Sequence, residues 1–150
     1  MASDDGATPR LGVLDELVGY HMRRASAVIA TDFSRATAGT GMRQVLFGVL
    51  SIIEANPGIN QGAVGRALGI QRANMVSLVN ELDERGLIAR RTASDDRRAF
   101  SLTLTPAGQR ILADSLARLR QHEDDVLSNL SGTERATLIL LLSRIEARSN

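Results

Sequence analysis

The chain has 150 residues, of which 43% are hydrophobic and 23% are charged. These values are typical of a soluble globular protein, and the length suits one domain with a sizeable core. Cysteine is absent, which excludes a disulfide framework, a thiolate nucleophile, a Cys-ligated zinc site and a cysteine redox switch. Residues 1–10 do not resemble a signal peptide, and no apolar run approaches the roughly 20 residues of a membrane span. We therefore expect a cytoplasmic protein.

Positive charge is concentrated in the middle of the chain. All 18 basic residues are arginines and 17 residues are acidic, so the formal net charge is only +1. Residues 61–110 hold eight arginines and five acids, whereas residues 1–60 and 111–150 each hold five arginines and six acids. A local net charge of +3 is consistent with a docking site for a polyanion, although an ordinary solvated arginine surface explains it equally well.

The first part of the chain predicts two helices. Residues 1–10 are expected to form a loose tail, and apolar residues spaced three and four apart predict an amphipathic helix over 11–31. A loop of small residues is expected over 34–41. A second helix is predicted over about 42–54, and the Asn-Pro-Gly sequence at 56–58 ends it because proline cannot continue a helix.

Two shorter helices separated by a glycine turn are predicted next. Asn60 is a suitable N-cap for a helix over 61–68, which Gly69 ends in a tight turn. The following helix is expected over about 71–85. Its inward-facing residues are predicted to be Met75, Leu78, Val79 and Leu82.

After this helix the pattern changes to that of a β-hairpin. Residues 87–91 and 99–104 predict two short strands, and residues 92–98 form a polar tip between them. Thr105 and Pro106 then begin a helix that is expected to reach about residue 130, with threonine as the N-cap and proline at the first helical position.

The last helix is predicted to be apolar on nearly all sides. Residues 131–134 (Ser-Gly-Thr-Glu) form a capping box, in which a hydroxyl and an acid three residues later cap the helix start. The helix is expected to continue to residue 148, and its segment 138–145 is mostly leucine and isoleucine. Such a helix is rarely left in water, so we expect it to pack on a partner chain as well as on its own.

The order of helix, glycine turn, helix and basic hairpin is that of a winged helix-turn-helix. The second helix of this motif enters the DNA major groove, where Asn and Gln pair with adenine and Arg pairs with guanine. The predicted DNA-binding residues are Gln61, Arg66, Gln71, Arg72, Ala73, Asn74, Ser77, Arg90, Arg91, Arg97 and Arg98.

Different roles are expected within this set. Arg97 and Arg98 at the hairpin tip suit a narrow minor groove or phosphates, and the sequence does not decide which of them enters the groove. Arg66, Arg90 and Arg91 are expected to contact phosphates. Arg72, Arg97 and Arg98 are also consistent with ordinary solvated arginines. Gln61 and Arg66 are equally consistent with residues that make no DNA contact, and the sequence does not decide whether Asn74 and Ser77 read bases directly.

At these positions the sequence resembles the MarR family of bacterial regulators. The resembling segments are Ile59-Asn60-Gln61, Ala67-Leu68-Gly69-Ile70, residues 82–88, Arg90-Arg91, Asp95-Asp96-Arg97-Arg98 and residues 102–108. The resemblance implies a mainly α fold with a small β-hairpin wing, in one domain over 11–150. Within that domain it implies a winged helix-turn-helix lobe at 42–104 and dimerisation helices at 11–40 and 106–150.

The resemblance also implies function. Members of this family act as homodimers on pseudopalindromic double-stranded DNA, and many are repressors released by a small phenolic or aromatic carboxylate ligand or by an acyl-CoA thioester. Two positions depart from the family pattern: Gln71 replaces a common capping residue, and Ser77 replaces a longer basic residue. Asp96 is expected to brace the wing. Candidate effector-binding residues are Tyr20, His21, Arg24, Met42, Arg43 and Phe47.

Other classes of function fit the sequence less well. The two histidines, His21 and His122, lie on separate predicted helices, and no metal-binding or phosphate-loop motif is present, so we expect neither an enzyme nor a bound metal or cofactor. A single-strand binder needs aromatic platforms, and the chain has only three phenylalanines and one tyrosine. A winged-helix protein-interaction module and a nonspecific duplex-DNA-binding protein remain as alternatives.

Overall fold

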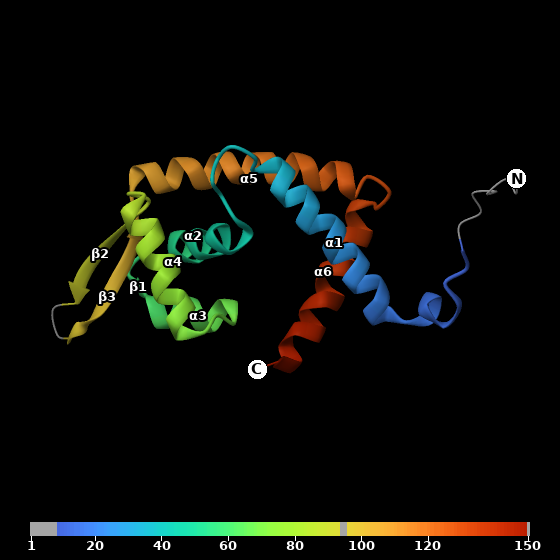
Figure 1. Cartoon of the computed structure of the whole chain (residues 1–150), viewed down its shortest axis with the longest axis horizontal. Helices are drawn as coiled ribbons and strands as arrows, with labels where there is room; N and C mark the ends of the chain where they lie inside the picture. Colours follow the sequence, from blue (N-terminus) through green and yellow to red (C-terminus); the bar gives the residue numbers. More distant parts are fainter. Residues whose placement is uncertain (1–8, 94–95, 150) are drawn as a thin grey trace, which may run out of the picture.

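A computed structural model describes residues 9–93 and 96–149, without the side chains of residues 93, 96–99 and 149. Its elements in chain order are η1 (Gly12–Glu16), α1 (Val18–Ala36), α2 (Gln44–Ala55), β1 (Ile59–Asn60), α3 (Gln61–Leu68), α4 (Arg72–Glu84), β2 (Ile88–Ala93), β3 (Asp96–Leu104), α5 (Pro106–Val126), α6 (Gly132–Glu146) and η2 (Ala147–Ser149). The long helix α5 joins two regions (Figure 1): a lobe made of α2, α3, α4 and the sheet, and the pair α1 and α6. The predicted mainly helical fold with a hairpin wing is confirmed.

The sheet is antiparallel, with strand order β1-β3-β2. Ile88 pairs with Leu104 at the base of the wing, and the register shifts between Thr92 and Ala93 near its tip. The wing strands are longer than the predicted 87–91 and 99–104. Strand β1 was not predicted, because its two residues are too few to show the alternating pattern of a strand.

The predicted caps of the lobe are confirmed. The Asn60 side chain accepts a hydrogen bond from Ala63 N at 2.8 Å and begins α3. Gly69 ends α3 with a φ of +64°, a left-handed conformation that glycine adopts without strain. The Thr105 hydroxyl accepts from Gly108 N at 3.1 Å and begins α5. These local signals fix both ends of α3 and the start of α5 at the residues expected, whereas α5 ends at Val126 rather than at about residue 130.

One core fills the lobe and includes the four residues predicted to face inward from α4. Its fully buried residues include Leu46, Val49, Leu50, Ile53, Val64, Met75, Val79, Leu82 and Leu102. Helix α5 begins directly against this core at Gly108, where an added Cβ would lie 2.0 Å from the Leu87 carbonyl oxygen. Glycine is therefore required there, and it fixes the start of α5 on the turn between α4 and β2.

The first helix differs from its prediction. Residues 12–16 form a 3-10 turn, Leu17 is extended, and α1 begins at Val18 rather than residue 11. The helix also continues to Ala36, into the segment 34–41 that was expected to be a loop. Phe33 and Ala36 are buried there, so tertiary packing extends the helix beyond the limit that its own sequence indicated.

Helices α1 and α6 are attached to α5 through polar contacts. His122 on α5 lies 3.0 Å from the Asp32 carboxylate on α1. Arg135 on α6 donates to the Asp124 carboxylate at 2.5 Å and to the Leu127 carbonyl at 3.0 Å. Within this chain α6 has no buried residue. None of the helices in the described part of the chain is long and apolar enough to span a membrane.

Candidate nucleic-acid interface

Helix α4 presents a polar ridge to solvent. Ala73, Ser77 and Asn80 are exposed and lie opposite the buried side of the helix. Arg72 and Asn74, which are also exposed, lie on the two flanks of this ridge. A helix that is polar outside and anchored by its inner side has the shape needed to enter a major groove about 12 Å wide.

The first turn of α4 has no side-chain cap. Gln71 occupies the N-cap position in an extended conformation and makes no capping hydrogen bond. The first N–H groups of a helix have no acceptor within the helix and carry partial positive charge. The uncapped start of α4 can therefore donate to a phosphate oxygen. Gln71, which replaces the common capping residue, thus leaves the first N–H groups of α4 without a side-chain cap.

A cleft of about 560 Å³ lies between α3, α4 and the wing. Four of the predicted DNA-binding residues line it: Gln61, Arg66, Arg72 and Arg90. Val76 and Phe100 line it too, and their exposures of 41% and 43% are high for apolar residues. Neither residue was predicted from the sequence. The sequence does indicate that Val76 is exposed, because this apolar residue falls outside the buried stripe of α4.

Arg90 braces the wing against α4. Its Nη2 donates to the Asn80 side chain at 2.5 Å, and its Nε lies 3.0 Å from the Asp83 carboxylate, at ion-pair distance but without hydrogen-bond geometry. We call Asn80, Asp83 and Arg90 the wing-side network. Arg91 follows on the same strand and is exposed, and successive side chains of a strand point to opposite faces. The structure thus separates these two arginines, and a phosphate contact by either stays a prediction.

The wing arginines cannot be placed in this interface. Arg97 and Arg98 are residues of strand β3. Their side chains, like that of Asp96, lie outside the described part of the structure. The roles expected for them remain predictions from the sequence.

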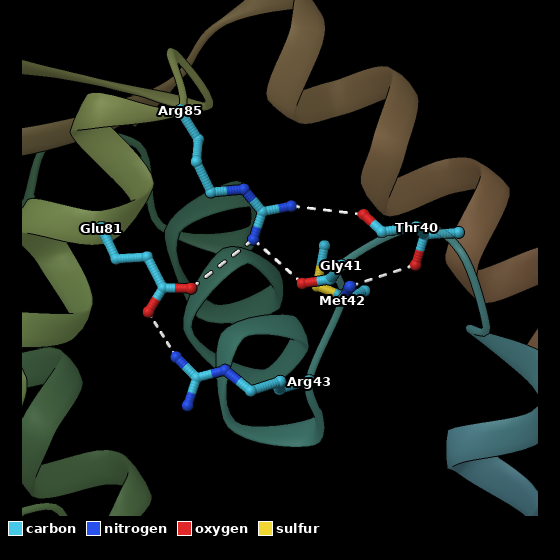
Figure 2. A network of polar contacts seen from close by, with 6 residues as sticks. All are labelled: Thr40, Gly41, Met42, Arg43, Glu81 and Arg85. Atoms are coloured by element: carbon cyan, nitrogen blue, oxygen red, sulfur yellow. Dashed lines mark hydrogen bonds and ion pairs between the residues drawn. The ribbon is translucent and has the colours of Figure 1, made fainter.

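A second network lies on the opposite flank of α4 (Figure 2). Arg43, just before α2, forms an ion pair with Glu81 on α4. Arg85 lies 3.7 Å from the other Glu81 oxygen and donates to the carbonyl oxygens of Gly41 at 3.0 Å and Thr40 at 3.3 Å. We call Arg43, Glu81 and Arg85 the α2-side network. It connects α4 to the segment between α1 and α2.

The six candidate effector residues do not form one pocket within this chain. Met42 is 4% exposed and belongs to the core. Phe47 packs edge-to-face on Phe33, with ring centroids 6.0 Å apart. Arg43 is held in the α2-side network, on the α4 side of α2. These three are therefore held by contacts in the core or in the α2-side network.

The remaining three candidates lie together on α1. The Tyr20 ring contacts the His21 ring edge-to-face at 5.5 Å, and the Arg24 guanidinium donates to the Tyr20 hydroxyl at 3.3 Å. Arg24 also lines a surface groove of about 410 Å³ with Val28 and Arg35. Arg35, the second arginine of this groove, was not predicted from the sequence, and the acid Asp32 lines the groove as well.

Known proteins resemble this chain over most of its length. A protein of Thauera aromatica described as a transcriptional regulator of the hcr operon is 38% identical over 129 residues, which cover 85% of this chain and 78% of that protein. The transcriptional repressor CouR, solved bound to a 23-mer DNA duplex, superimposes with a TM-score of 0.88 and is 34% identical. That match covers 93% of this chain and 99% of CouR.

Two more solved structures and a family sequence pattern also match this chain. A structure of CouR bound to p-coumaroyl-CoA has a TM-score of 0.79 at 33% identity, covering 93% of this chain and 98% of that one. A protein of Pseudomonas aeruginosa described as a transcriptional regulator has the same TM-score at 31% identity, covering 88% and 98% of the two chains. The sequence pattern of the MarR family matches residues 41–99, which include α2, α3, α4 and most of the wing. The chain therefore belongs to the MarR family of transcriptional regulators.

Proposed function

We propose that this protein is a homodimeric repressor that binds a pseudopalindromic DNA operator through α4 and the wing and is released by a small ligand. One observation supports this most strongly: the exposed polar ridge of α4, with an uncapped first turn, lies beside a cleft lined by three arginines. A ridge of this kind presents amide, hydroxyl and guanidinium groups to base edges while the cleft arginines attract the phosphates.

Duplex DNA is the partner that best suits this surface. Asn74 and Arg72 extend from opposite flanks of the ridge, and the small side chain of Ala73 between them permits close approach to the bases. Most of the arginines that make up the charge surplus of residues 61–110 belong to the helices and strands of this lobe. CouR, which superimposes on this chain over 93% of its length, is a repressor with a DNA complex, and this likeness favours the same partner and the same sense of regulation here.

A second copy of the chain is expected to cover α6 and the outer side of α1. Ile139 and Leu140 on α6 are 66% and 61% exposed, and Val18 on α1 is 69% exposed. Apolar surface of this kind is costly in water, and a twofold partner presents the same residues in return. A dimer would place two α4 helices about 34 Å apart, one turn of duplex DNA.

The ligand that we propose is an anionic aromatic compound or its CoA thioester. Two guanidinium groups of α1 lie near the Tyr20 ring, with Arg23 at 5.5 Å and Arg24 at 5.9 Å from its centroid. Aromatic and cationic groups together suit a ring with a carboxylate, or the adenine and phosphates of CoA. CouR binds p-coumaroyl-CoA, which supports the thioester among these candidates.

The DNA proposal can be tested by selecting duplexes from a random pool and titrating the best one by fluorescence anisotropy. Competing random duplex is present in excess, at about 50 and 200 mM salt. Tight, salt-sensitive binding that resists the competitor supports the proposal. Binding that the competitor abolishes identifies a nonspecific DNA-binding protein, and no binding at either salt points to a protein-interaction module.

The ligand proposal has a separate test on the same complex. We expect p-coumaroyl-CoA or p-coumarate to release the labelled duplex, and free CoA to have little effect. Arg24→Ala should weaken this release without changing duplex affinity in the absence of ligand. If neither compound changes the anisotropy at saturating concentration, the aromatic ligand class is wrong.

A further inference from the structure

Helix α4 carries a carboxylate on each flank that pairs with an arginine from outside the helix. Glu81 belongs to the α2-side network and Asp83 to the wing-side network. Two residues along an α-helix correspond to a rotation of about 200°, so these two carboxylates extend from opposite flanks. The DNA-facing ridge lies between them, and the two networks together oppose rotation of α4 about its own axis.

Rotation of α4 matters because base recognition tolerates little displacement. Asn74 lies seven residues before Glu81, about two turns away on the same flank. Side-chain ends lie about 5–6 Å from a helix axis, so a rotation of about 10° moves them by about 1 Å. A hydrogen bond to a base edge requires a distance within about half an ångström of its optimum.

We propose that Glu81 is a positioning residue for operator recognition: it sets the rotation of α4 through Arg43 and Arg85 and does not itself contact DNA. Figure 2 shows both Glu81 oxygens directed at these arginines. Arg85 extends the same connection to the backbone at Thr40 and Gly41, where the chain passes from α1 to α2. The position of α4 is thereby tied to the segment leaving α1.

This role is separable from folding. Arg43 is 57% exposed and Glu81 is 36% exposed, and ion pairs of such exposure contribute little to the stability of a fold. The buried residues Met75, Leu78 and Val79 keep α4 on the core whether or not the network is present. Loss of the network should therefore change the orientation of α4 more than its stability.

The inference rests on the proposed function, and its test uses the selected operator with random duplex as reference. We expect Glu81→Gln to lower the ratio of operator affinity to random-duplex affinity about tenfold, the equivalent of one misaligned base contact. Its affinity for random duplex should not fall, because removing a negative charge near DNA weakens repulsion. The thermal midpoint should stay within a few degrees of wild type.

Glu84→Gln is the matched control, since Glu84 is an exposed acid three residues along the same helix. It removes the same charge and should leave the affinity ratio unchanged. Arg43→Gln should lower the ratio as Glu81→Gln does, and the double variant should lose no more than either single one. A summed loss in the double variant would mean that the two residues act independently.

The results of these titrations distinguish the positioning role of Glu81 from the proposed DNA-binding function. If wild type does not prefer the operator, the proposed function and the inference both fail. If wild type prefers the operator and Glu81→Gln keeps the full ratio, only the positioning role is wrong. The same conclusion holds if Glu81→Gln and Glu84→Gln raise both affinities equally, because Glu81 would then act only as a repelling charge.

Discussion

The lobe and the terminal helices differ in how completely one chain can bury them. In the lobe, α2, α3, α4 and the sheet enclose Leu46, Leu50, Leu82 and Leu102 with no solvent exposure. In α6 no residue is buried, and its isoleucines and leucines face solvent over most of its length. Helix α5 belongs to both regions: its beginning packs on the lobe core and its second half lies along α1.

This difference in burial indicates that the lobe and the terminal helices have different roles. A lobe with its own core can keep a precise DNA-reading surface without help from a partner. In the proposed dimer a second chain covers the terminal helices, so their burial would depend on protein concentration. Changes in the lobe should therefore act on folding and DNA recognition, and changes in α6 should act on assembly.

The largest expected effect comes from removing part of the lobe core. Leu50→Ala should lower the free energy of unfolding by about 2–5 kcal/mol, because Leu50 has 0% exposure and its loss leaves a cavity. Urea unfolding of the full chain measures this. Leu50→Met, which nearly conserves volume, should cost less than about 1.5 kcal/mol. Equal losses for the two variants would show that the lobe core is not closely packed.

A charged residue on α6 should break the dimer and leave the lobe intact. Ile139→Asp is expected to weaken association by about 2 kcal/mol or more, since the proposed interface would have to bury a carboxylate. Sedimentation over a dilution series measures the change, and circular dichroism checks the helices. Ile139→Leu is the control that retains the dimer. A monomeric wild type would refute the assignment of α6.

Two substitutions in the lobe should change DNA binding in different ways. Asn74→Ala is expected to cost about 1–3 kcal/mol, mainly at the base pair that it contacts. Arg97→Ala should weaken binding to all duplexes and reduce the salt dependence of the affinity. Titrations against the operator, its single-base variants and random duplex separate the two patterns. Equal losses on operator and random duplex for Asn74→Ala would contradict its assignment as a base-reading residue.

The smallest effect is expected at the start of α6. The Glu134 carboxylate accepts hydrogen bonds from Ser131 N and Oγ, both at 2.8 Å, and these hold the pKa of Glu134 below its usual value. A lowered pKa in the folded state means that this stabilisation is present above about pH 4.5 and is lost as the pH falls further.

Thermal melts of wild type and Glu134→Gln at pH 7 and at about pH 3.5 measure this contribution. We expect the difference between the two proteins to be largest at pH 7 and to shrink as the pH is lowered. Ser131→Ala removes the hydroxyl cap and should cost about 1 kcal/mol at pH 7. A difference between wild type and Glu134→Gln that persists unchanged in acid would mean that the carboxylate does not provide the cap.

Local signals explain how much of the lobe could be predicted from the sequence. Asn60, Gly69 and Thr105 are capping residues whose effect is confined to their own helix ends, and each cap formed as expected. The bounds of α1 were wrong at both ends. Its apolar spacing runs on through residues 12–16, which form a separate 3-10 turn, and burial of Phe33 extends its other end.

The candidate site was only partly predictable, because its arrangement depends on long-range pairs. The sequence indicated Arg72, Asn74 and the arginines of the wing from their order in the motif. It did not indicate that Arg90 would be held by Asp83, or that Arg43 would pair with Glu81 38 residues away. Such ion pairs form only when separate helices and strands have packed together, so no local sequence pattern predicts them.

The most direct test of the account is the dependence of affinity on half-site spacing in the selected operator. Two lobes on one dimer should read half-sites on one face of the duplex, about one turn apart. Inserting about five base pairs between the half-sites turns one of them to the opposite face. We predict that affinity then falls to that of a single half-site. Unchanged affinity would show that each lobe binds alone, and would contradict the dimeric DNA-reading account.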